Sequence, residues 1–214
     1  MGGDLWVRAA TGTALVAVTL GAIWLGPVTY TALLSLLVLL GCREFESAWR
    51  RIRPMSSFVS RWLLSLVVLV LPACAMLWMA GIGEGYDPLI PMGWFALMWT
   101  NDTGAYLAGR SFGRHKLAPQ ISPGKTWEGA LGGAALTFLM GAWLQWHWGF
   151  EAGILCAAMV SLFGPLGDLA ESLLKRKAGI KDSGQILPGH GGVLDRFDSH
   201  FFAAPIAALV LMFF

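Results

Sequence analysis

Long apolar runs, repeated along most of the chain, are the feature that most restricts its fold. Of the 214 residues, 56% are hydrophobic and only 13% are charged, too few to cover a soluble domain of this length. Runs long enough to cross a bilayer as helices occur at about 8–26, 27–42, 62–80, 89–109, 126–147, 150–168 and 195–214. The sequence therefore predicts an all-α fold: a polytopic transmembrane helix bundle of about seven spans, forming a single integral membrane domain over residues 1–214.

The distribution of positive charge predicts the orientation of this bundle. If the N-terminus is cytoplasmic and the spans alternate, all 15 Lys and Arg residues fall on the cytoplasmic side, and the opposite connections at 81–88 and around 146–151 have neither. This bias is typical of membrane proteins with cytoplasmic positive loops. We therefore expect the polar segment between the last two spans to face the cytoplasm.

That segment joins the sixth span to the seventh and holds most of the candidate chemistry. If the sixth helix continues past Gly167, then Asp168, Glu171, Ser172 and Lys175 share one helix face. A carboxylate at the end of an apolar span is costly unless it is paired or hydrated, so Asp168 is a candidate site residue. An ordinary ion pair with the neighbouring basic cluster is the alternative.

A glycine-containing turn, LPGHGG, follows the basic residues of this segment. Lys175, Arg176 and Lys177, taken alone, are explained as anchors to anionic head groups. Lys181 and Asp182, however, lead directly into the turn, where Gly191 and Gly192 allow backbone amides to approach phosphate oxygens. His190 is the histidine with the most suggestive neighbours.

Two further carboxylates, Asp195 and Asp198, stand three residues apart at the start of the last span. They fall on one helix face near the cytoplasmic boundary, and with Asp168 they make an oxygen-rich set. Carboxylates with waters and substrate phosphates suit Mg2+, and we expect this ion at Asp168, Asp195 and Asp198. A second cation is left open.

This pattern resembles the signature of the phosphatidate cytidylyltransferase family, the CDP-diacylglycerol synthases. The matching positions are Ser172, Lys175, Arg176, Lys181, Asp182, Pro188, His190, Gly191, Gly192, Asp195, Arg196 and Asp198. A second block at 102–129 and the start of the chain at 8–49 are also similar to the family. The chain is shorter than is usual for the family, and Gly124 stands where the family often has a second basic residue.

The resemblance implies transfer of a cytidylyl group from CTP to phosphatidate, giving CDP-diacylglycerol and pyrophosphate at a bacterial inner membrane. Lys175, Arg176, Lys181 and Arg196 would then contact phosphates, Ser172 would donate a hydrogen bond, and His190 would act as a base or orient a phosphate. The expected partners are CTP, phosphatidate, the lipid bilayer and a second copy in a homodimer, with no nucleic acid. Glycines such as Gly129 and Gly167 would serve either that interface or the internal core.

The second block supplies further candidates for substrate binding. The resemblance places Asp102 in the site, although a polar cluster there also suits hydrogen bonding between helices. Ser122 and Pro123 predict a helix N-cap, with Lys125 and Glu128 on the opening turns of the fifth span. Lys125 would reach a substrate phosphate, and Glu128 would pair with Lys125 or another cation.

Two other functions fit parts of the pattern. A nucleotidyltransferase for a related lipid phosphate would use the same chemistry. A transporter would place its acidic residues near the middle of the membrane on several spans, whereas here they gather at one edge beside a basic loop.

Overall fold

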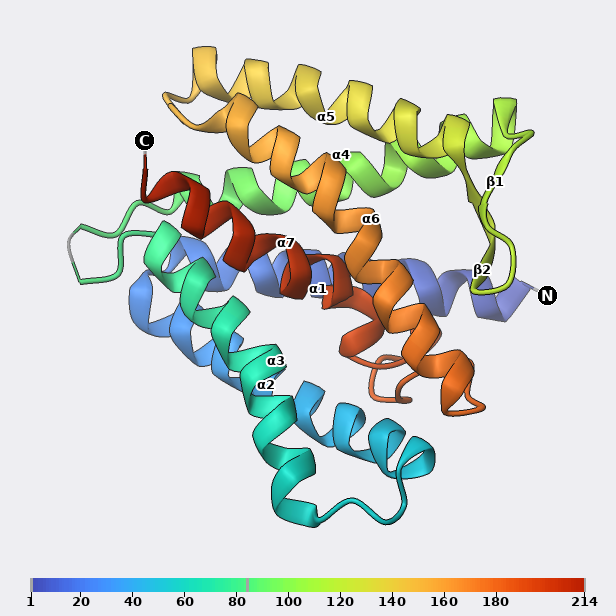
Figure 1. Ribbon diagram of the computed structural model, residues 1–214. Helices are drawn as coiled ribbons and strands as arrows, with labels where there is room; N and C mark the ends of the chain where they lie inside the picture. The colour runs from blue at the N-terminus through green and yellow to red at the C-terminus, as the bar shows by residue number, and fades with distance from the viewer. Residues whose placement is uncertain (1, 84, 214) are drawn as a thin grey trace.

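The computed structural model describes residues 2–83 and 85–213; Met1, Glu84 and Phe214 of the predicted domain lie outside the described residues. Over these residues the chain forms seven helices and one hairpin (Figure 1). The helices are α1 (Gly2–Trp24), α2 (Pro27–Ile52), α3 (Phe58–Met79), α4 (Leu89–Phe112), α5 (Trp127–His147), α6 (Gly153–Lys177) and α7 (Leu194–Leu211). Strands β1 (Lys116–Ala118) and β2 (Ser122–Thr126) form the antiparallel hairpin. The predicted all-α helix bundle is confirmed.

Four of the described helices are long and apolar enough to cross a membrane, namely α1 from Trp6, α2, α3 and α6. The helix α4 falls short because Asn101, Asp102 and Thr103 interrupt its apolar run. The chain is therefore a membrane protein by composition and helix length, and the count of seven spans stays a prediction.

Successive connections lie at opposite ends of the bundle. Figure 1 shows the N-terminal end of α1, the hairpin and the α6–α7 loop toward one end. The α5–α6 connection and the C-terminal end of α7 lie toward the other. Because Lys and Arg cluster in the hairpin region and the α6–α7 loop, the first end is the basic end of the molecule.

Glycines allow the helices around the site to approach closely. A Cβ atom at Gly133 would lie 2.7 Å from the carbonyl oxygen of Asn101, and one at Gly129 would lie 2.8 Å from that of Ala105. At Gly167 it would lie 2.7 Å from the carbonyl oxygen of Asp198. These glycines therefore serve packing of α5 on α4 and of α6 on α7 within the chain.

The start of α5 differs from the prediction. Ser122 is not an N-cap, because residues 122–126 pair with β1 in the register Lys116 to Thr126 and are held extended. The cap is Thr126, whose hydroxyl accepts a hydrogen bond from the amide of Gly129 at 3.1 Å. Lys125 consequently lies on β2, and only Glu128 lies on the first turn of α5.

The end of α6 agrees with the prediction that this helix continues past Gly167. The helix ends at Lys177, followed by Gly179 with a φ of 67°. The amide of Ile180 donates to the carbonyl of Lys175, and that of Gly179 donates to the carbonyl of Arg176. This glycine-dependent C-terminal motif turns the chain sharply into the polar loop 178–193.

Candidate active site

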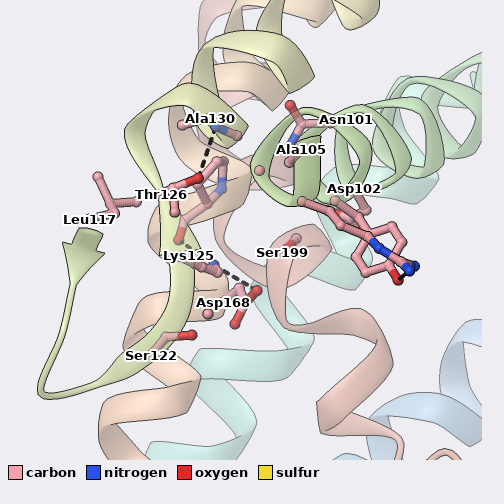
Figure 2. Close-up of a pocket in the computed structure, with 16 residues that line it drawn as sticks. Asn101, Asp102, Ala105, Leu117, Ser122, Lys125, Thr126, Ala130, Asp168 and Ser199 are labelled. Carbon is pink, nitrogen blue, oxygen red and sulfur yellow. Dashed lines mark hydrogen bonds and ion pairs between the residues drawn. The ribbon is translucent and has the colours of Figure 1, made fainter. Parts of the chain in front are cut away.

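A cavity of about 470 Å³ opens between the hairpin and helices α4, α5, α6 and α7. Four of the predicted site residues line it: Asp102 from α4, Ser122 and Lys125 from β2, and Asp168 from α6. Figure 2 shows these side chains around one space, with Ser199 of α7 at its inner side. Segments distant in the sequence therefore converge here.

An ion pair crosses the cavity. The Lys125 Nζ atom lies 2.6 Å from Oδ2 of Asp168, and both side chains remain partly exposed, at 23% and 38% (Figure 2). The same ammonium donates to the carbonyl oxygen of Pro165 at 3.4 Å. The pair closes β2 onto α6 and still leaves both charges in contact with the cavity.

Sequence reasoning missed two polar residues on the α4 wall of the cavity. Arg110 donates through Nη1 to the hydroxyl of Tyr106 at 3.0 Å, and both side chains line the space. The available signal was spacing, because Asp102, Tyr106 and Arg110 follow one another at four-residue intervals and share a helix face. Arg110 adds a second positive charge to the cavity.

Three predicted carboxylates line two different cavities: Asp102 and Asp168 face the one described above, and Asp198 faces a second one. Oδ1 of Asp168 accepts a hydrogen bond from the Ser172 hydroxyl at 3.3 Å, and Oδ1 of Asp198 accepts from the Ser199 amide at 2.7 Å. The second cavity has a volume of about 220 Å³ and is lined mainly by apolar side chains, with Glu171 and Asp198 as its acids.

Asp195 belongs to a different cluster, although it lies only three residues before Asp198. Its Oδ1 atom is 2.6 Å from Nζ of Lys175, which is also 2.5 Å from Oε2 of Glu171. Its Oδ2 atom accepts hydrogen bonds from the amide and hydroxyl of Ser183 and from the amide of Gly192, at 2.7–2.8 Å. Both oxygens of Asp195 are therefore occupied within the protein.

The predicted metal ligands do not form a preassembled site. Among residues 2–83 and 85–213, no three His, Cys, Asp or Glu side chains are placed to hold one metal ion. The reason lies in the separate positions of the three acids: Asp168 faces the cavity with Lys125, Asp198 faces the second cavity, and Asp195 bonds the α6–α7 loop. The magnesium site stays a prediction.

The glycine turn is folded onto itself. The amide of Gly191 donates to the carbonyl of Leu187 at 3.1 Å, and the amide of Gly192 is used by Asp195. Arg196 donates through Nε to the carbonyl of His190 at 3.0 Å. The His190 ring lies beside Gly12 of α1, where a Cβ atom would be 3.4 Å from Nε2. A phosphate would reach these amides only by replacing their internal partners.

The remaining predicted residues do not line the cavity. Arg176 donates to the carbonyl of Ile121 at 3.3 Å, which links α6 to the hairpin. Glu128 contacts neither Lys125 nor another lysine, because it bonds the amides of Arg114 and His115 and the His115 ring, at 2.6 Å. Lys181 and Asp182 are exposed on the α6–α7 loop.

The part of the chain that forms the cavity and the α6–α7 loop is similar to known proteins. The sequence model of the Cytidylyltransferase family matches residues 89–214, which is more than half of the chain. The chain belongs to the cytidylyltransferase family. The matched residues include the whole lining of the cavity and all of the α6–α7 loop.

Individual members of the family are also similar to the chain. Proteins named phosphatidate cytidylyltransferase from Staphylococcus epidermidis and Staphylococcus haemolyticus are each 48% identical to the chain over 122 residues. The protein of the same name from Staphylococcus aureus is 47% identical over 122 residues. In each case the match covers 55% of this chain and 47% of the relative. The chain spans about half the length of the curated relatives it matches.

Proposed function

We propose that this cytidylyltransferase-family protein transfers a cytidylyl group from CTP to phosphatidate, releasing pyrophosphate and leaving CDP-diacylglycerol in the membrane. The observation that carries the proposal is the cavity, in which Lys125, Asp168 and Arg110 from three separate elements meet within the family-matching region. The shared name of the staphylococcal relatives, phosphatidate cytidylyltransferase, supports the choice of substrates. A related lipid phosphate would use the same cavity.

The reaction needs the residues that the cavity offers. A phosphate oxygen of the lipid bonds to the α-phosphorus of CTP, and the bond from that phosphorus to the pyrophosphate oxygen breaks. Both reactants are anions, so fixed positive charges must offset their repulsion and hold an in-line geometry. Lys125 and Arg110 are placed to do this at the cavity wall. Because the lipid supplies the nucleophile, no covalent intermediate with the protein is required.

The cavity has the size and mixed lining of a small-molecule site. Its volume of about 470 Å³ falls within the usual range for ligand pockets, roughly 300–1,000 Å³. Apolar contributions from Ala105, Leu117 and Ala130 lie beside the charged groups. A nucleotide base and its phosphates could therefore be accommodated side by side.

The acids of α4, α6 and α7 suit a divalent cation. Asp102 and Asp168 line the cavity, and α7 packs against α6 at Asp198, so the three could offer hard oxygen donors to one cation. Asp168 and Asp198 would hold Mg2+ in this proposal, and Asp195 would join them only by giving up its bonds within the loop. When bound, the ion would stabilise negative charge on the triphosphate.

The basic end of the molecule supports a proposal for its orientation in the membrane. We infer that the basic end faces the cytoplasm of a bacterial inner membrane, because all Lys and Arg residues fall on that side in an alternating topology. CTP would then enter from the cytosol, and the lipid would arrive from the surrounding leaflet. The expected homodimer also belongs to the proposal.

The proposal is tested with the purified protein in detergent, labelled CTP and phosphatidate. We expect a lipid-soluble labelled product that requires Mg2+ and is not formed from UTP or from diacylglycerol. Changing Lys125 to Ala should lower kcat/KM about 100-fold, because a cation facing the reacting phosphates is lost. Lys116 to Ala is the matched control, because Lys116 is exposed on β1 and does not line the cavity, and it should keep wild-type turnover. No labelled lipid from the wild-type protein would overturn the proposal.

A further inference from the structure

A buried acid from the N-terminal half contacts the α6–α7 loop. Glu44 lies on α2, outside the residues matched by the family model, and is only 6% exposed. Within the described part of the chain, no Lys, Arg or His forms an ion pair with it. A buried carboxylate without a cation must be stabilised by hydrogen bonds.

Those hydrogen bonds come from the start of α7. Oε1 of Glu44 accepts from the amide of Val193 at 3.1 Å, and Oε2 accepts from the amide of Leu194 at 2.9 Å. The first amides of a helix have no partner within the helix, and Val193 provides no side-chain cap to α7. Glu44 therefore caps α7 from another helix, where a negative charge is also favoured by the helix dipole.

The same carboxylate is connected to Asp195. The Ser183 hydroxyl lies 3.1 Å from Oε2 of Glu44 and 2.8 Å from Oδ2 of Asp195. The Ser183 amide and the Gly192 amide also donate to Asp195. The Ser183 hydroxyl therefore lies between the two acids. The amides of Val193 and Leu194 bond Glu44, and the amide of Gly192 bonds Asp195.

Two glycines make this arrangement sterically possible. A Cβ atom at Gly192 would lie 2.5 Å from Oε2 of Glu44, and one at Gly184 would also collide with this carboxylate. Real Cβ atoms do not approach that closely, so the loop can wrap Glu44 only with glycine at both positions. The glycine content of the loop is therefore explained in part by the acid that it surrounds.

We propose that Glu44 is a positioning residue for cytidylyl transfer, which holds the α6–α7 loop and the first turn of α7 in the arrangement that the site requires. It acts through Asp195, whose bonds it shares through Ser183, and through Asp198, one turn into the helix that it caps. This inference rests on the proposed function for its catalytic consequence. Its structural part, the anchoring of the loop, does not.

The experiment compares Glu44→Ala and Glu44→Gln with the control Glu46→Gln. Glu46 lies two residues further along α2 and pairs with Arg61 at 2.9 Å, away from the loop. Hydrogen exchange of residues 179–194 in detergent reports loop anchoring without any substrate. We expect amide exchange in this segment to be at least about tenfold faster in Glu44→Ala, intermediate in Glu44→Gln and unchanged in Glu46→Gln.

Kinetics then test the positioning role. We expect Glu44→Ala to lower kcat about 10- to 100-fold while KM for CTP changes less than about threefold, because the cavity wall with Lys125 is untouched. Glu44→Gln should restore part of kcat, since its amide oxygen can still accept one bond. A variant that only lowered the amount of folded protein would lose kcat and exchange protection throughout the chain.

The outcomes separate the two proposals. Wild-type exchange of residues 179–194 in both Glu44 variants would overturn the inference, as would a kcat no lower than that of Glu46→Gln. If Glu44→Ala does not fold, Glu44→Gln gives the same comparison. If the wild-type protein shows no turnover, the proposed function fails, and the exchange measurement still decides whether Glu44 anchors the loop.

Discussion

The cavity and the α6–α7 loop use the same residue types in opposite ways. In the cavity, Asp168 pairs with Lys125 and keeps 38% of its side chain exposed. Beside the loop, Asp195 of α7 pairs with Lys175 of α6, is 5% exposed and accepts three further hydrogen bonds from loop residues, and we call this the loop pair. A ligand can replace one partner of the exposed Lys125–Asp168 pair. Both oxygens of Asp195, by contrast, are already bonded within the protein. Charged residues that the sequence does not distinguish can therefore have different roles. Some can bind a ligand, and others hold the ligand-binding residues in place.

The largest effect that would test this comparison is expected at Asp168. Changing Asp168 to Asn should lower turnover about 100- to 1,000-fold, because it removes charge where the substrate phosphates and the proposed cation would meet. The free energy of unfolding should change by no more than about 1 kcal/mol, as is usual for a partly exposed ion pair. Labelled-lipid formation and thermal unfolding in detergent measure the two quantities. Near-normal turnover would remove Asp168 from the site.

Loss of the Lys175–Asp195 pair should lower the stability of the protein more than loss of the Lys125–Asp168 pair. Changing Lys175 to Met leaves Glu171 and Asp195 buried together without their shared cation, at side-chain exposures of 8% and 5%. Loss of one partner from a buried pair costs about 3–5 kcal/mol. We expect a much larger loss of thermal stability than in the comparison variant Lys125→Met. Equal stability losses in the two variants would contradict the conclusion that the loop pair stabilises the fold more than the cavity pair.

A smaller effect is expected from adding a charge to the cavity. Gly124 lines the cavity, and a Cβ atom there meets no other atom within 4 Å. Changing Gly124 to Lys should therefore fit without strain and lower KM for CTP about three- to tenfold through attraction to the phosphates. Gly124→Gln, of similar length but neutral, is the matched control. An unchanged KM in the lysine variant would indicate that the triphosphate lies elsewhere.

Most of the helical framework could be predicted, because it depends on local patterns. The apolar runs predicted all seven helices of the described chain, and helix spacing placed Ser172 beside Asp168 and Glu171 beside Lys175. The hairpin could not be predicted in this way. Residues 122–126 carry a helix-start pattern, and only their pairing with β1 holds them extended.

The sequence named part of the cavity lining, including Lys125 and Asp168, but not Tyr106 and Arg110, and it did not predict the contacts. Helix spacing and residue type drew attention to Asp168, Asp195 and Asp198 together. Their partners differ, however: Lys125 of β2 pairs with Asp168, loop amides bond Asp195, and the Ser199 amide of α7 bonds Asp198. Glu44 was missed because nothing around it on α2 signals a contact with residues 139 to 150 positions later. Its position became informative only when the fold brought the first amides of α7 against it.

The cap on α7 also has a consequence for biosynthesis. Glu44 and its amide donors are separated by 149 and 150 residues, so a growing chain presents the acid long before its partners are synthesised. Until then the carboxylate must remain hydrated, since burial without those donors would be costly. Synthesis of the start of α7 thus supplies the amides that Glu44 requires, and a chain interrupted before α7 would retain a carboxylate without them.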